Sequence, residues 1–182
     1  MNYKRWIFVA ISLFGIGIAF GLTTPAGIAS LISDELTALE EFSGILAPFK
    51  VSTVIFIFIK NAVVLLSSFA LSPIFCLVPI LTLAVNGWLL ALVSTIIVEE
   101  KSLGFVLAGL LPHGIIELPA LFIGEAAALS FGAMAIVALF KKERRNLLSS
   151  SLRQNLKYLS IALALLLPAA IIETYITPLL VT

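Results

Sequence analysis

Residues 107–125 read LAGLLPHGIIELPALFIGE and contain the only histidine of the chain, His113. Glu117 follows it by four residues, and Pro112 and Pro119 flank the pair. The other side chains of this run are nearly all apolar, as in a membrane-spanning helix, where a polar group is costly unless it faces the protein interior. Each proline also removes a backbone hydrogen-bond donor. The run therefore predicts an interrupted helix beside a titratable pair inside a membrane protein.

The composition of the whole chain indicates the same class. Of the 182 residues, 61% are hydrophobic and 12% are charged, and the mean hydropathy is +1.18. One soluble core cannot hide so much apolar surface, and several stretches match the ~20 residues that cross a bilayer core. The runs are continuous and not alternating, which excludes a transmembrane β-barrel. We predict an all-α, polytopic transmembrane helical bundle in a single membrane domain.

Charge and cysteine content exclude several function classes. The net charge is +1, which gives no indication of a nucleic-acid partner. Cys76 is the only cysteine, so an intramolecular disulfide and a multi-cysteine metal site are excluded. No cofactor is predicted, and the partner expected from composition is the lipid bilayer. The N-terminal apolar run is interpreted as a retained span, because no convincing cleavage site precedes Pro25.

Five full spans are predicted, over residues 6–22, 51–70, 74–98, 120–140 and 157–181.

Two further segments are predicted to be helical without crossing the bilayer. Residues 27–46 place apolar side chains at three- to four-residue spacing with acidic residues largely between them, which predicts an amphipathic surface helix. Residues 103–140 are too long for one span and short for two. We therefore predict that residues 103–118 form a re-entrant or broken half-helix, with six full spans as the alternative.

The basic residues predict an orientation in the cell membrane. Lys4 and Arg5 place the N-terminus in the cytoplasm by the positive-inside rule. If residues 103–140 cross once, the basic loop KKERR at 141–145 is cytoplasmic as well. Two crossings would place this loop outside, against the rule. The single crossing is therefore preferred.

Several polar residues lie within the predicted membrane segments. The candidate intramembrane polar site consists of Lys60, Asn61, Asn86, His113, Glu117, Glu125 and Glu173.

Lys60 is the most costly member of this set, because it is the tenth residue of its predicted span. A charge at that depth costs roughly 2.5–3.5 kcal/mol on insertion scales, so it requires a partner, and Glu117, Glu125 and Glu173 are the available anions. His113 and Glu117 are four residues apart, so one helical face presents both.

Two hypotheses account for these residues. In the first, the polar site binds or moves a small ion or proton, at helix ends exposed by Pro112 and Pro119; whether the ion is a metal is left open. In the second, an ion pair between Lys60 and a carboxylate locks the helices of a scaffold. Such a scaffold would assemble with other membrane proteins or with itself.

The glycine pair Gly17 and Gly21 forms a GxxxG pattern in the first predicted span. This pattern favours close helix contact. The contact is either within the chain, the simpler interpretation, or between copies in a homo-oligomer.

Catalysis is the least favoured class. The single histidine excludes an HExxH zinc site, which requires two. Ser130 lies in SFG, without a GxSxG nucleophile elbow. We therefore expect that the protein is not an enzyme.

The run LLPHGIIELPALFIGEAAALSFG resembles the signature of the stage II sporulation protein M family, in which a proline–histidine–glycine is followed by a glutamate. IKNA at 59–62, VNG at 85–87 and AAIIETYITP at 169–178 are also similar to polar landmarks of that family. The resemblance covers about residues 50–180. It implies a membrane fold and a role for His113, Glu117 and Glu173. In spore formers it also implies a membrane scaffold that works at the engulfing membrane with partners that remodel peptidoglycan.

Overall fold

The computed structural model describes residues 3–25 and 48–181, and within them it contains helices and no strand. Five segments are long and apolar enough to cross a membrane: α1 (Tyr3–Leu22), α3 (Val51–Leu71), α4 (Leu77–Glu100), α5 (Leu103–Phe140), and Lys142–Tyr175, which comprises the 3-10 helix η1 (Lys142–Leu147) and α6 (Leu148–Tyr175). A short helix, α7 (Thr177–Leu180), follows. This confirms the all-helical, multi-pass class. The amphipathic helix predicted at 27–46 lies outside the described residues.

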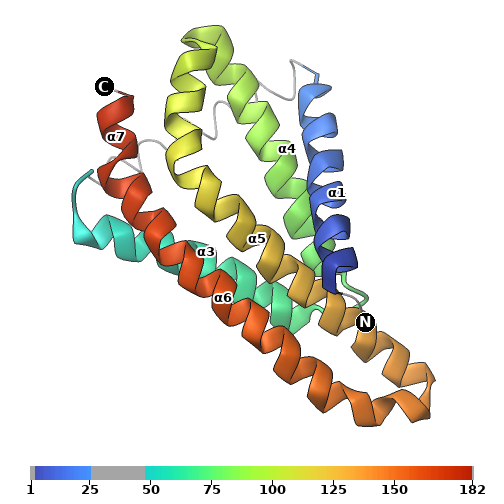
Figure 1. Cartoon of the computed structure of the whole chain (residues 1–182). Coiled ribbons are helices and arrows are strands. Elements are labelled where there is room, and N and C mark those ends of the chain that lie inside the picture. The colour runs from blue at the N-terminus through green and yellow to red at the C-terminus, as the bar shows by residue number, and fades with distance from the viewer. Residues whose placement is uncertain (1–2, 26–47, 182) are drawn as a thin grey trace.

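The helices form a bundle with two parts (Figure 1). α1 and α4 stand side by side, whereas α3, α6 and the second half of α5 run obliquely across them. Successive spanning helices run in alternating directions. As a result, the N-terminus and the connection from α5 through η1 to α6 lie at the same end of the molecule, and the C-terminus lies at the other.

α5 corrects the prediction for residues 103–140. These residues form one continuous helix of 38 residues that contains both Pro112 and Pro119, so the separate half-helix over 103–118 and a span beginning at 120 were wrong. Each proline removes only one hydrogen-bond donor, and the remaining bonds of the helix keep it continuous while the prolines bend it. Figure 1 shows this bend between the yellow and golden parts of α5. The bend turns the middle of α5 towards α3 and α6.

The helix ends also differ from the predicted limits. Residues 72–76 form the turn between α3 and α4, in which Phe75 and Cys76 have positive φ angles of 51° and 54°. α4 therefore begins later than predicted, at Leu77, and it continues to Glu100, two residues beyond the predicted limit at 98. α6 begins at Leu148, nine residues before the predicted limit at 157.

α1 and α4 pack through glycines. A Cβ atom at Gly17 would collide with the backbone carbonyl of Ala84, and one at Gly21 would collide with the backbone of Trp88. Gly87 makes the reciprocal approach to the backbone of α1. These contacts bring two helix backbones together, as small residues do in membrane helices. The Gly17/Gly21 face is therefore covered by α4 of the same chain, which leaves no room there for the second copy considered in the homo-oligomer interpretation.

The second half of α5 lies between α3 and α6. Gly124 faces Leu65 of α3 and Ala162 of α6, and the run Ala126–Leu129 is buried. Tyr3 near the N-terminus donates a hydrogen bond to the carbonyl of Ile123 at 2.6 Å. Small side chains thus let α5 act as the central helix that positions the others.

Candidate functional site

Three helices bring polar residues to one cavity. α3 contributes Lys60 and Asn61, α4 contributes Asn86, and α5 contributes His113 and Glu117. The cavity has a volume of about 460 Å³, and its remaining lining is mostly leucine. Five of the seven residues of the predicted polar site therefore line a common space, although they come from distant parts of the chain.

His113 and Glu117 face each other across one turn of α5. The distance between His113 Nε2 and Glu117 Oε2 is 3.8 Å, and the side chains are 13% and 30% exposed, respectively. Asn61 Nδ2 of α3 donates a hydrogen bond of 2.9 Å to the other carboxylate oxygen, Glu117 Oε1. The amide thereby fixes the carboxylate so that Oε2 faces the imidazole.

Glu173 joins this pair from the C-terminal part of α6. His113, Glu117 and Glu173 each have a nitrogen or oxygen atom that lies within 4.8 Å of the corresponding atoms of the other two residues. These three residues are called the His–Glu–Glu cluster below. A histidine nitrogen and two carboxylate oxygens are ligands that proteins use for several metal ions.

Thr177, at the start of α7, contacts the cluster from behind. Its Oγ1 lies 3.3 Å from His113 Nδ1. The sequence interpretation missed this residue, because a single threonine near the end of a helix gives no distinctive signal. The nearest signal was its position four residues after Glu173 in the run AAIIETYITP.

Lys60 does not form the ion pair expected from the sequence. Within the part of the chain that the structure describes, no carboxylate lies within 4.0 Å of its ammonium group. The side chain is exposed on α3 at the edge of the cavity, yet it is close enough to Glu173 to interact with it electrostatically. Lys60 thus contributes positive charge near the His–Glu–Glu cluster without being bonded to it.

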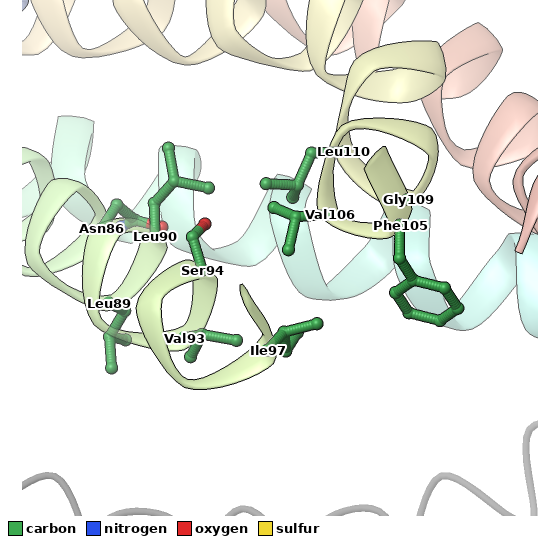
Figure 2. Close-up of a pocket in the computed structure, with 10 residues that line it drawn as sticks. All are labelled: Asn86, Leu89, Leu90, Val93, Ser94, Ile97, Phe105, Val106, Gly109 and Leu110. Carbon is green, nitrogen blue, oxygen red and sulfur yellow. The ribbon is translucent and has the colours of Figure 1, made fainter. Parts of the chain in front are cut away.

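Asn86 lies where two cavities meet. Its side-chain nitrogen donates to the carbonyl of Thr82 in the preceding turn at 2.7 Å, and among the described residues no hydrogen bond joins Asn86 to the cluster. Asn86, Leu90 and Leu110 line both the polar cavity and a neighbouring apolar cavity of about 440 Å³ between α4 and the first half of α5. Figure 2 shows Val106 and Leu110 of α5 pointing towards α4 across this apolar space.

Glu125 belongs to a different environment from the other predicted site residues. Its side chain is 0% exposed, and Ser68 of α3 donates a hydrogen bond of 2.5 Å to its Oε2. Among the described residues, Oε1 has no hydrogen-bond partner. Glu125 therefore links α3 to α5 at a second position, apart from the polar cavity.

Ser68→Ala is expected to lower the free energy of unfolding by about 1–3 kcal/mol, because it leaves the buried Glu125 carboxyl group without its donor. The double variant Ser68→Ala/Glu125→Leu is expected to recover most of this loss, since both polar partners are then absent. Thermal unfolding of the purified variants in detergent measures the difference. If the double variant is less stable than Ser68→Ala, the Ser68–Glu125 bond is not the reason for the loss.

The comparisons with known proteins agree with this description. The family model described as stage II sporulation protein M matches residues 10–178. An uncharacterized protein of Methanocaldococcus jannaschii is 27% identical over 182 residues, which cover 97% of this chain and 96% of the archaeal one. No solved structure matches the chain. The match of the family model over nearly the whole chain confirms the resemblance noted in the sequence, and the chain belongs to the stage II sporulation protein M family.

Proposed function

We propose that this protein binds a small cation within the membrane at the His–Glu–Glu cluster and moves it across the bilayer. One observation carries the proposal: ligand atoms of His113, Glu117 and Glu173 converge within 4.8 Å in a chain with five candidate spans. Two carboxylates this close repel each other in a low-dielectric environment, and a cation removes that repulsion. The neighbouring cavity provides space for an ion to enter.

The proposed setting is the cell membrane, with the N-terminus and the 141–145 loop in the cytoplasm. The support is the distribution of basic residues: Lys4 and Arg5 precede the body of α1, and four of residues 141–145 are basic. Both groups lie at the end of the bundle where the N-terminus meets the α5–α6 connection (Figure 1). The positive-inside rule assigns such an end to the cytoplasm.

The proposed role is not enzymatic. Among the described residues, no serine or cysteine is hydrogen-bonded to His113, whose polar neighbours are Glu117, Glu173 and Thr177. The imidazole is thus engaged with groups suited to hold an ion or a proton and not with an activated nucleophile.

Flux into proteoliposomes tests the proposal. The full chain is reconstituted, and uptake of protons, Na⁺, K⁺, Mg²⁺, Mn²⁺ and Zn²⁺ is measured for the wild type and for Glu117→Gln. Glutamine keeps the oxygen that accepts from Asn61 but removes the negative charge, so the variant is expected to fold. It is expected to lose at least about 90% of the flux, which corresponds to an increase of ~1.4 kcal/mol or more in the barrier to ion movement. Matching elution in size-exclusion chromatography establishes that both proteins are intact. Equal flux in the two proteins, or no flux of any ion in the wild type, would contradict the proposal.

A scaffold without flux is the second candidate. It is favoured by the polar bonds that join α3 to α5, from Asn61 to Glu117 and from Ser68 to Glu125. Buried polar contacts of this kind can specify how helices pair. Under this alternative, Glu117→Gln would lower the thermal stability or alter the assembly of the protein, and the wild type would carry no ion.

A further inference from the structure

The hydrogen bonds of Thr177 indicate which ring nitrogen of His113 carries the proton. Thr177 Oγ1 donates its only proton to the carbonyl of Ile172 at 3.4 Å. We therefore assign His113 Nδ1 as the donor of the 3.3 Å hydrogen bond to Thr177 Oγ1. In a neutral imidazole with the proton on Nδ1, the lone pair is on Nε2. The nitrogen that faces Glu117 is thus an acceptor.

The oxygen of Glu117 that faces His113 is an acceptor as well. Asn61 occupies Oε1, so the lone pairs of Oε2 point into the cluster. Glu173 adds a further carboxylate oxygen to the same space. Three acceptors from α5 and α6 therefore converge, and none of the contacts among them supplies a donor.

The distances distinguish a metal ion from a shared proton. The 3.8 Å between His113 Nε2 and Glu117 Oε2 is too long for an N–H···O hydrogen bond, whose usual length is about 2.9–3.0 Å. An ion bound at about 2.0–2.2 Å from each of two nitrogen or oxygen ligands joins atoms up to about 4.4 Å apart. The third ligand lies within the 4.8 Å limit of the cluster, so a small side-chain rotation brings it into range.

The ligand types indicate the class of metal. Imidazole nitrogen suits Zn²⁺ and neighbouring transition metals, whereas Mg²⁺ and Ca²⁺ take oxygen ligands. Two carboxylates balance the charge of one divalent ion. We infer that the His–Glu–Glu cluster is a site for a divalent transition-metal ion such as Zn²⁺. This inference rests on the proposed function, because it names the cation that the same site would take.

Two residues act as positioning residues for this site. Asn61 orients Glu117, and Thr177 sets the tautomer of His113. Such outer contacts are found behind many metal ligands, and their loss typically weakens metal affinity by about 10–100-fold. Neither residue offers an atom to the cluster itself.

Equilibrium dialysis of the full chain in detergent tests the inference, with Zn²⁺ and Co²⁺ as probes and Mg²⁺ for comparison. The wild type is expected to bind Zn²⁺ and Co²⁺ at a saturable site that Mg²⁺ does not occupy. Glu173→Gln and His113→Gln each remove a ligand and are expected to weaken Zn²⁺ affinity by about 100-fold or more, beyond the effect of outer contacts. Thr177→Val is expected to weaken it by about 10-fold with unchanged stoichiometry. Glu143→Gln, which changes an exposed carboxylate on η1, is the matched control and is expected to bind as the wild type does.

The outcomes separate this inference from the proposed function. Saturable Zn²⁺ binding without flux in proteoliposomes would contradict the proposal that the protein moves an ion across the bilayer, and it would support the metal site. Flux of protons or Na⁺ in a protein that does not bind Zn²⁺ would overturn the metal site alone. Zn²⁺ binding that is equal in the wild type, Glu173→Gln and His113→Gln would also overturn the inference, because the ion would then be bound elsewhere.

Discussion

Lys60→Met is expected to tighten Zn²⁺ binding at the His–Glu–Glu cluster by about 10-fold or more. The Lys60 ammonium interacts electrostatically with Glu173 and therefore competes with any cation at the cluster. A tenfold change in affinity corresponds to about 1.4 kcal/mol, which is a modest repulsion between a unit charge and a divalent ion at an effective dielectric constant of ~20. Methionine keeps an unbranched side chain of similar length without the charge. Equilibrium dialysis of the variant and the wild type measures the change.

The same variant separates an ion site from a structural lock. If Lys60 served to neutralise the carboxylates of a scaffold, its removal would lower the thermal stability of the protein and would not tighten metal binding. Lys142→Met is the matched control, because Lys142 is exposed on η1 at the end of α5 remote from the cluster. A Zn²⁺ affinity that is unchanged or weaker in Lys60→Met would contradict the assigned role of Lys60.

Gly17→Val is expected to separate α1 from α4 and to lower the free energy of unfolding by about 3 kcal/mol, the upper part of the usual range for overpacking. The collision at Gly17 is with the backbone carbonyl of Ala84, and a backbone cannot move aside as a flexible side chain can. Relief therefore requires the two helices to move apart along their whole contact. Thermal unfolding in detergent, followed by circular dichroism, measures the loss.

Gly15→Val provides the control in the same helix. A Cβ at Gly15 would meet no atom within 4 Å, and the residue is exposed. Both substitutions exchange the same residue types in α1, so their helix-propensity effects are alike and only the contact with α4 differs. Equal losses of stability in the two variants would show that α1 does not depend on the close approach at Gly17.

The sequence identified most of the polar residues that line the cavity, because a polar residue in an apolar run is a strong signal. Lys60, Asn61, Asn86, His113 and Glu117 each interrupt a predicted membrane segment, and all five line one cavity. Sequence alone did not identify how they contact one another. The amide of Asn61, and not the ammonium of Lys60, bonds to Glu117. Which of these two neighbouring side chains reaches Glu117 depends on the rotation of α3 relative to α5, and the sequence does not give that rotation.

Glu125 shows why one predicted member falls outside the cluster. Eight residues separate it from Glu117, and at 3.6 residues per turn this spacing rotates a side chain by about 80° around the helix. Glu125 therefore faces Ser68 of α3, and Glu117 faces the polar cavity.

The largest error in the predicted fold was the break placed within α5, which is one continuous helix. Pro112 and Pro119 were interpreted as breaks because proline is unfavourable within an isolated helix. In a bundle, packing against neighbouring helices compensates for the missing donors, and the chain bends without ending the helix. The two prolines therefore predicted where α5 bends, but they did not predict that α5 remains one helix.

The most direct test of cation binding at the cluster is an experimental structure of the protein saturated with Zn²⁺, in which anomalous scattering at the zinc edge locates the metal. We predict an anomalous peak about 2.0–2.2 Å from His113 Nε2 and from one carboxylate oxygen each of Glu117 and Glu173. A structure under the same conditions with no peak there, and with the Lys60 ammonium between the two carboxylates, would contradict a cation site and would identify the cluster as a structural ion pair.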